Sequence, residues 1–416
     1  MNASNSEPQG TDHYPSWKMT LTVMAIAQFL SGVGFSFVLP FFQFYFQKLG
    51  VEDQADALMW YGWASFVFGV TMAVSAPIWG MVADRYGRKL MVLRSMFAGS
   101  IILGLMGLAT QPWHLVLLRF FQGMTTGTVT ASVTLVSSVT PSASLGFSLG
   151  MMQTAVLIGS STGPLIGGFL ADHLGYRVPC GLAMVILFAG TVLVLFGASE
   201  RFVPPENHKP NGLAIMRGIV RTSGFPVLLG IYFLVYILST VVYAILPFFI
   251  KNLLEKPELA ATYTGLFLFS YGLLAGVSAA FLGKIGDHFG HMKVLVISLI
   301  VTGLISIPQA MAANIWVLFF ERCATGLAIG GVIPSVNALA STIITKDKIG
   351  SAYGMTSSVT TLGIGLGPLF GGIMVSYIGL RWPFVIIGVF AIIIAAVANK
   401  MLNHPVHGLA VPKNSN

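Results

Sequence analysis

The chain has 416 residues, of which 55% are hydrophobic and only 9% are charged, and its mean hydropathy is +0.82. This composition excludes a soluble globular protein and indicates a chain that lies in the lipid bilayer. The net charge of +8 comes from basic residues scattered over predicted loops, so nucleic acid is not an expected partner. The two cysteines, Cys180 and Cys323, fall in predicted helices, so we expect no disulfide framework, no metal and no cofactor.

Twelve apolar runs follow one another, each roughly 20 residues or longer and therefore able to cross a hydrocarbon core about 30 Å thick as a helix. We predict an all-α membrane protein of 12 transmembrane helices in two six-helix bundles. The predicted parts are an N-terminal tail (1–18), an N-terminal bundle (19–199), a linker (200–221), a C-terminal bundle (222–402) and a C-terminal tail (403–416). The predicted spans are 19–47, 58–82, 92–110, 114–137, 145–171, 178–199, 222–250, 261–285, 293–312, 316–340, 350–377 and 382–402.

Basic residues gather in the loops on one side of the membrane. With the N-terminus inside the cell, most lysines and arginines fall in cytoplasmic segments such as 84–94 and 200–221. The opposite side holds only Lys48, Arg177, Lys251, Lys256 and Arg381. This is the positive-inside bias. We therefore expect a multi-pass protein of the inner (plasma) membrane with both termini in the cytoplasm.

The segment between the second and third runs, 80–89, reads G-M-V-A-D-R-Y-G-R-K. An acid at the end of one helix can hold arginines of the loop or meet the positive end of a neighbouring helix, and glycine permits a tight turn. An ordinary basic loop is the alternative interpretation. The full pattern resembles the signature loop G-x-x-x-D-R-x-G-R-[KR] of the major facilitator superfamily of transporters. The resemblance implies a gating role for Gly80, Asp84, Arg85, Gly87 and Arg88.

Arg119 lies about six residues into the fourth run, roughly 9 Å along the helix at the rise of an α-helix. An arginine at that depth is costly and usually faces an internal cavity or a partner. With Gln122, Gly123 and Gly127 it resembles the third signature of the superfamily, l-x-x-x-R-x-x-q-G, whose arginine is linked to proton coupling. A snorkelling or purely structural arginine is the alternative.

The fifth run contains G-S-S-T-G-P-L-I-G-G over 159–168. Gly159, Gly163 and Gly167 share one helix face and allow close approach of another helix, while Pro164 bends the helix. Helix packing without a role in transport is the alternative. The string resembles the motif G-x-x-x-G-P-x-x-G-G of the drug/proton antiporter branch, which implies a conformational role for these four residues and Gly168.

The second half of the chain repeats these motifs about 204 residues later. R-C-A-T-G-L-A-I-G over 322–330 corresponds to 119–127, and G-I-G-L-G-P-L-F-G-G over 363–372 corresponds to 159–168. The loop 283–291 keeps the glycines and the acid but has histidine in place of arginine, which predicts a weaker or pH-dependent charge clamp. Such a duplicated membrane chain is expected to be a secondary transporter with two pseudo-symmetric bundles around a central cavity.

Glu321 lies well inside the tenth run beside Arg322, whereas nearly every other acid lies in a predicted loop, tail or helix end. A carboxylate that gains and loses a proton is well placed next to a cation that responds to its charge. We therefore predict that Arg119, Glu321 and Arg322 serve proton coupling. A permanent ion pair between Glu321 and Arg322 or Arg119 is the alternative.

Six side chains in predicted helices are candidates to line the substrate cavity, and packing or lipid-facing positions are their alternative. The first run, where many cation exporters of the superfamily carry an acid, has only two glutamines besides its hydroxyl groups. A preference for strongly cationic drugs is therefore not expected. The six candidates are Gln28, Phe29, Tyr232, Tyr236, Tyr243 and Asn337.

The resemblance covers the chain from Trp17 to about Leu402, and stretches such as 77–85 and 88–95 are similar to the MdtG-like group of bacterial multidrug exporters. It implies a drug/proton antiporter that works by alternating access, with protons and a small amphiphilic molecule as partners, and we expect a monomer. The sequence has no nucleotide-binding P-loop, so we predict a gradient-driven transporter and no enzyme. A dedicated metabolite importer or facilitator is the alternative. A membrane sensor or scaffold is a third hypothesis, which the complete first-half motifs disfavour.

Overall fold

The computed structural model describes residues 17–200, 202, 218–222, 224–344 and 349–402. Most of the two predicted tails and of the predicted linker lies outside the described residues. Within the described ranges the regular structure is helical, without a strand. The elements are α1 (Trp17–Ser36), η1 (Leu39–Phe41), α2 (Phe42–Lys48), α3 (Gln54–Tyr86), α4 (Arg88–Met106), α5 (Pro112–Thr125), α6 (Thr128–Val139), η2 (Ser142–Ser144), α7 (Leu145–Leu174), α8 (Arg177–Gly197), α10 (Phe225–Leu253), η3 (Pro257–Leu259), α11 (Ala260–Phe289), α12 (His291–Gln309), α13 (Ile315–Ile329), α14 (Val332–Ile343), α15 (Ile349–Ile378) and α16 (Trp382–Leu402), where η marks a 3₁₀ helix.

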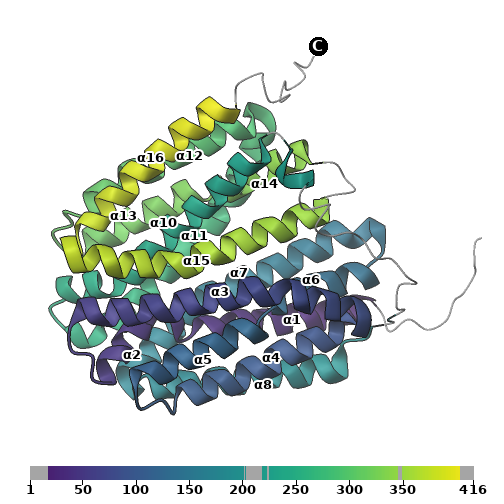
Figure 1. Ribbon diagram of the computed structural model, residues 1–416, viewed down its shortest axis with the longest axis horizontal. Coiled ribbons are helices and arrows are strands. Elements are labelled where there is room, and N and C mark those ends of the chain that lie inside the picture. Colours follow the sequence, from purple (N-terminus) through teal and green to yellow (C-terminus); the bar gives the residue numbers. More distant parts are fainter. Residues whose placement is uncertain (1–16, 201, 203–217, 223, 345–348, 403–416) are drawn as a thin grey trace, which may run out of the picture.

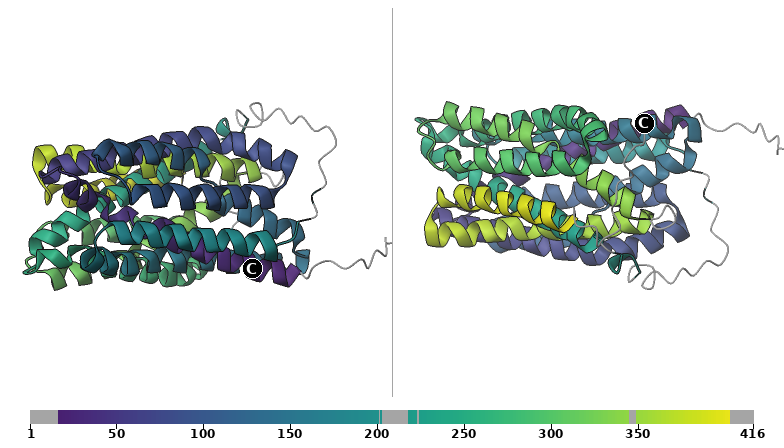
Figure 2. Two further views of the ribbon diagram at one scale, coloured as in Figure 1. Left: turned by 90° about the horizontal axis from the view of Figure 1, so that it is seen from below. Right: turned by 90° about the horizontal axis from the view of Figure 1, so that it is seen from above.

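The helices form two bundles that lie side by side, α1 to α8 in one and α10 to α16 in the other (Figure 1). Helix α3 lies beside α15 and α7 beside α11 where the bundles meet, and α1 begins at the same end of the molecule at which α16 ends (Figure 2). Eleven helical segments of the described chain are long and apolar enough to cross a membrane. The predicted all-α membrane fold is therefore confirmed.

Three predicted spans differ from the structure because they are interrupted. In the fourth span, 114–137, α5 ends at Thr125 and α6 begins at Thr128, and Gly127 between them has a φ of +146° that favours glycine. In the first span Pro40, which has no N–H to donate, lies at the start of η1. In the tenth, Gly330 and Gly331 separate α13 from α14. Hydropathy does not detect these breaks, because glycine and proline leave the apolar run intact.

The turns between paired helices repeat in the two bundles. Gly87, with φ of +95°, joins α3 to α4, and Gly290, with φ of +94°, joins α11 to α12. Only glycine adopts this conformation without strain. The N-cap side chains of α3 and α13 cap their own helices: the Asp53 carboxylate accepts from Ala55 N at 2.7 Å at the start of α3, and Asn314 caps α13. The tight turn predicted at Gly87 is confirmed.

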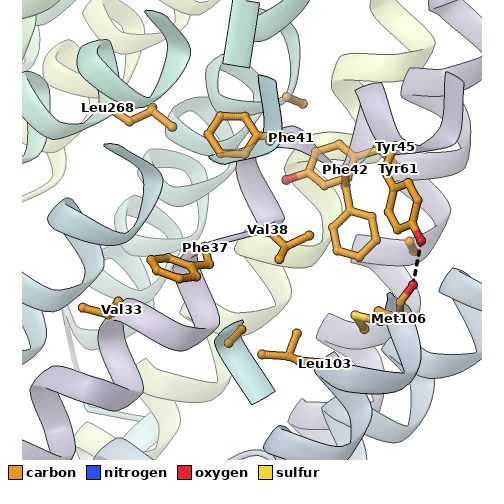
Figure 3. Close-up of a cluster of buried hydrophobic side chains, with 14 of the residues drawn as sticks. Val33, Phe37, Val38, Phe41, Phe42, Tyr45, Tyr61, Leu103, Met106 and Leu268 are labelled. Carbon is orange, nitrogen blue, oxygen red and sulfur yellow. Dashed lines mark hydrogen bonds between the residues drawn. The ribbon is translucent and has the colours of Figure 1, made fainter. Parts of the chain in front are cut away.

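The core around the break in the first span is aromatic (Figure 3). Phe37, Phe41 and Phe42 are at most 2% exposed. The Tyr45 hydroxyl donates to the Met106 carbonyl at 2.9 Å and so fastens α2 to the end of α4. This anchoring fixes the interrupted part of the first span within its own bundle.

The bundles touch near one end of the molecule and separate toward the other. We call the end where α3 begins and α7 ends the closed end, and the end where α1 begins and α16 ends the open end. Near the closed end a methyl group added at Gly62 of α3 would lie 2.7 Å from Leu369 Cα of α15, so only glycine fits. Toward the open end, a methyl group at Gly80 of α3 or Gly354 of α15 would meet no atom within 4 Å. Figure 1 shows α16 inclined away from α8 in that direction.

Candidate transport site and gates

Two buried arginines occupy corresponding places in the two bundles. Arg119 of α5 is 5% exposed, its guanidinium carbon lies 4.0 Å from the ring centroid of Phe68 in α3, and its Nη1 donates to Gln122 Oε1 at 2.7 Å. Arg322 of α13 is 4% exposed and lies 4.5 Å from the ring centroid of Tyr271 in α11. Each guanidinium therefore rests on an aromatic face of the neighbouring helix, a favourable cation–π contact.

Glycines allow this arrangement by bringing the helices together. A methyl group at Gly123 of α5 would lie 2.5 Å from the Phe68 carbonyl oxygen, and one at Gly326 of α13 would lie 2.7 Å from the Tyr271 carbonyl oxygen. Ser75 of α3 also donates its hydroxyl to the Gly123 carbonyl at 3.1 Å. The glycine four residues after each arginine thus packs against the neighbouring helix, a role that its place in the repeated motif does not reveal.

Neither buried arginine has an acidic partner among the described residues. The described part of the chain contains one ion pair, His291–Asp287, and the Nε atoms of Arg119 and Arg322 form no hydrogen bond. Glu321 is half-buried and its Oε2 also has no hydrogen-bond partner. The alternative of a permanent ion pair of Glu321 with Arg322 or Arg119 is therefore not realised in this conformation. The interior at this level contains two arginine cations and one unpaired carboxyl group.

Of the predicted cavity residues of the second bundle, two contact each other and the other two lie further along α10. The Tyr232 hydroxyl of α10 donates to Asn337 Oδ1 of α14, so these two are brought together. Tyr236 packs against α15, because a methyl group added at Gly363 of α15 would lie 3.1 Å from the Cβ of Tyr236. Tyr243 is half-buried on the same helix as Tyr232.

No metal-binding group of three His, Cys, Asp or Glu side chains exists among the described residues.

The predicted cavity residues of α1 lie close to its contact with α7. Gln28 is 1% exposed and its Oε1 has no hydrogen-bond partner. The Phe29 carbonyl oxygen would lie 2.5 Å from a methyl group at Gly159. Phe29 thus contributes its backbone to helix packing, and its half-buried side chain packs against the buried core.

A carboxylate joins the two bundles at the closed end. Asp172, near the end of α7, accepts three hydrogen bonds from the first turn of α11: from Thr262 N at 2.6 Å, from Thr262 Oγ1 at 2.7 Å and from Ala261 N at 3.3 Å. An anion at a helix N-terminus is favourable because the unpaired N–H groups and the helix dipole are positive there. Asp172 is not among the residues predicted from sequence, where its only signal is an acid at the end of the fifth run.

Amide side chains add further contacts between the bundles at the closed end. Gln43 Nε2 donates to the Ala244 carbonyl at 3.3 Å, and Lys251 Nζ donates to Gln47 Oε1 at 3.1 Å. The closed end is therefore sealed by tight helix packing and by hydrogen bonds that a separation of the bundles would break.

The glycine face predicted on the fifth span packs against α1. A methyl group at Gly163 would lie 2.7 Å from the Val33 carbonyl oxygen, and one at Gly167 would collide with the Phe37 carbonyl group. Gly168, next to this face, instead meets Ala261 at the start of α11. Helix α7 thus links a contact within its bundle to the contact between bundles.

The loop 80–89 lies at the open end, and its partner is an acid that the sequence analysis left in the linker. Glu200, after α8, accepts from Arg88 N at 2.8 Å and from Lys89 N at 2.7 Å at the start of α4. Asp84 and Arg85 are exposed, and Asp84 has no ion pair in the described structure. In this conformation Glu200, rather than Asp84, meets the positive end of a neighbouring helix.

The corresponding loop of the second bundle contains the only ion pair of the described residues. His291 Nε2 lies 3.1 Å from Asp287 Oδ1 one helical turn away. The histidine that replaces the usual arginine is thus in contact with the acid of the repeated motif. This contact is fully charged only when the imidazole is protonated.

Two comparisons identify the family of this chain. The sequence profile of the Major Facilitator Superfamily matches residues 24–255 and 228–415. The chain belongs to the major facilitator superfamily. It is 32% identical over 372 residues to the multidrug resistance protein MdtG of Proteus mirabilis (strain HI4320), covering 89% of this chain and 92% of the relative. The MdtG protein of Salmonella newport (strain SL254) is 32% identical over 375 residues, with the same shares covered.

Solved structures of superfamily transporters share the fold. A bacterial homologue of the human lysosomal transporter Spinster, in an inward-facing and occupied conformation, superposes with a TM-score of 0.77 at 15% identity, covering 94% of this chain and 98% of that one. The nucleoside transporter NupG superposes with a TM-score of 0.75 at 14% identity, covering 94% and 100%. At such low identity these structures show the fold alone.

Membership of the superfamily confirms several predictions from sequence. The chain is a multi-pass membrane transporter and not an enzyme, and it transports a small molecule. The similarity to MdtG proteins, expected from stretches such as 77–85, is also confirmed.

Proposed function

We propose that this superfamily member exports small amphiphilic compounds, including drugs, in exchange for protons. The observation that carries the proposal is the 32% identity to an MdtG multidrug resistance protein over 89% of the chain. The names of these relatives favour export over dedicated import of one metabolite.

We assign the open end to the cytoplasm and the closed end to the outside of the cell. The loop 80–89, with three arginine or lysine side chains in its last five residues, lies at the open end, as the positive-inside rule requires of a cytoplasmic loop. Both termini are then cytoplasmic, and the structure faces inward. Transport would proceed by rocking of the N-terminal bundle (19–199) against the C-terminal bundle (222–402), joined by the linker 200–221. No partner subunit is needed for this motion, so we propose a monomer.

The gate residues of this motion are proposed from the packing described above. Opening of the closed end requires separation of α7 from α11 and of α3 from α15, and it breaks the hydrogen bonds of Asp172. The glycines and Pro164 of α7 would let that helix move as one piece with α1. Closing of the open end would bring the loop 80–89 toward α15, which is where Gly80, Asp84, Arg85, Gly87 and Arg88 would act.

We propose that Glu321 carries the proton, with Arg322 and Arg119 responding to its charge. Its Oε2 is buried and free of hydrogen bonds, so a proton can be added or lost there without breaking a fixed contact. With the carboxyl group protonated the protein's own groups give the interior two positive charges, and with it ionised they give a net charge of about +1. Such an interior suits neutral, zwitterionic or weakly acidic amphiphiles at least as well as permanent cations. The side chains proposed to line the cavity are Gln28, Phe29, Tyr232, Tyr236, Tyr243 and Asn337.

Transport in proteoliposomes tests this proposal. A panel of neutral, acidic and cationic amphiphiles is supplied with and without an imposed pH gradient. We expect gradient-driven accumulation by the native protein, loss of that accumulation in Glu321→Gln, and intact exchange of labelled substrate in the same variant. Glu258→Gln, which removes an exposed acid in η3, is the matched control and should behave as the native protein. Undiminished accumulation by Glu321→Gln, or native transport confined to quaternary ammonium dyes, contradicts the proposal.

A further inference from the structure

A small pocket lies beside Arg322 in the interior of the C-terminal bundle. Its volume is about 40 Å³, and its walls come from α10, α11, α12, α13 and α16. Because a buried water needs a cavity of roughly 10–15 Å³, this space can hold one small ion together with a water molecule. A drug-sized molecule does not fit.

Arg322 is the one charged side chain among the residues that line this pocket. Its neighbours there are hydroxyl-bearing residues and aliphatic side chains, and the described residues include no acid in ion-pair contact with it. A buried cation without a counter-charge is costly, and the face of the Tyr271 ring offsets only part of that cost.

Two buried polar groups of the lining residues are free to donate a hydrogen bond. Arg322 Nε and Thr302 Oγ1 are buried without a hydrogen-bond partner. Two other hydroxyls are engaged: Ser306 Oγ donates to the Thr302 carbonyl at 2.7 Å, and Thr325 Oγ1 donates to the Glu321 carbonyl at 2.7 Å while it accepts from Gln309 Nε2 at 2.8 Å. Ser239 and Tyr271 also line the pocket. A guanidinium and a free hydroxyl that face one pocket can both donate to an anion there, and no lining side chain supplies a negative charge.

The first bundle shows how the same arginine is satisfied when an acceptor is present. Arg119 Nη1 donates to Gln122 Oε1 at 2.7 Å. The residue in the corresponding place of the second bundle is Thr325, whose hydroxyl hydrogen is already donated to the Glu321 carbonyl. The duplicated sites therefore differ in that Arg119 has a side-chain amide acceptor at this position whereas Arg322 has a threonine there.

We propose that this pocket binds one small monovalent anion of about the size of chloride, held by Arg322 and by the Thr302 hydroxyl. The anion accepts from the guanidinium and neutralises the arginine inside the C-terminal bundle. It is distinct from the transported compound, because the pocket lies within one bundle and is too small for an amphiphile.

The thermal unfolding midpoint of the purified full-length protein tests this site. Chloride is compared with gluconate at constant ionic strength, so that general screening stays equal. We expect the midpoint to rise with chloride, as the logarithm of its concentration above the dissociation constant, and bromide to act in the same way. Bromide should also give an anomalous diffraction peak beside Arg322. Thr302→Val, which keeps the side-chain shape but removes the hydroxyl, should weaken chloride binding about tenfold.

Two further variants keep the test decisive. Arg322→Gln should lose the response to chloride, whereas Arg119→Gln should keep it. If Arg322→Gln does not fold, Ala391→Leu on α16 fills the pocket while leaving the arginine in place, and it should also lose the response. Equal midpoints in chloride and gluconate, or a chloride response that survives in Arg322→Gln or Ala391→Leu, would overturn the proposal. Stabilisation by benzoate or acetate but not by halides would assign the site to the acid group of an organic compound and overturn it as well.

Discussion

Removing the charge of Asp172 should shift the protein away from the inward-facing conformation. The carboxylate uses both oxygens to accept three hydrogen bonds from the start of α11, and asparagine offers a single acceptor oxygen and no charge. A hydrogen bond to a charged group contributes about 1.5–3 kcal/mol, and an anion at a helix N-terminus about 0.3–1 kcal/mol. Because Asp172 is only half-buried, we take the low end of these values, about 2 kcal/mol for Asp172→Asn. This corresponds to roughly a 30-fold change in the ratio of the two conformations.

Distance measurements between spin labels across the closed end test this prediction. Labels on cysteines at Leu174 and Glu258, both exposed and on opposite bundles, report the separation of α7 from η3 in a background without Cys180 and Cys323. We expect a larger population of long distances in Asp172→Asn than in the native sequence. Glu255→Gln, an exposed acid at the same end, should leave the distribution unchanged. An unchanged distribution in a well-folded Asp172→Asn protein would refute the assignment of this contact as a gate.

Three further substitutions test the packing and the loops. Gly163→Leu should abolish transport or destabilise the protein. Gly163→Ala should lower the free energy of unfolding by about 1–3 kcal/mol, because even one methyl group meets the Val33 carbonyl oxygen. Gly150→Ala, with open space around it, is the control, and full activity of the leucine variant would contradict the α1–α7 contact. Asp84→Asn should slow transport but leave the thermal stability of the inward-facing state unchanged, since Asp84 has no ion pair in the described structure. Transport at the native rate would contradict a gate role for Asp84. Glu200→Gln should lower the free energy of unfolding by about 1–2 kcal/mol because the cap of α4 is lost. Glu52→Gln is the control, and an equal loss of stability in both variants would argue against this cap.

Features that repeat in the sequence were the ones that could be predicted. The duplicated motifs place Arg119 and Arg322 on corresponding helices, and Gly87 and Gly290 in corresponding turns. Hydropathy was sufficient for the fold class, because each span must be apolar over its full length to cross the bilayer. It could not locate the breaks within spans, because glycine at 127 does not alter the apolar character of its run.

Contacts between distant segments could not be predicted from one sequence. Asp172 and Glu200 both cap a helix that begins elsewhere in the chain, and the residues around them in sequence do not indicate which helix that is. The absence of an ion pair for Glu321 and for Arg322 among the described residues was equally hidden, since neighbours in sequence on a helix point in directions about 100° apart. The sequence places these groups within helices, whereas packing decides which of them meet.

Proton flux during substrate movement tests the central claim, coupled antiport, most directly. Proteoliposomes enclose a pH-sensitive dye, and a substrate gradient is imposed across the membrane with no initial pH difference. The account predicts that entry of substrate drives protons out, so that the lumen becomes alkaline in proportion to the substrate taken up, and that Glu321→Gln lets substrate equilibrate without this change. Proton movement in the same direction as substrate, or substrate movement by the native protein with no proton flux, would contradict it.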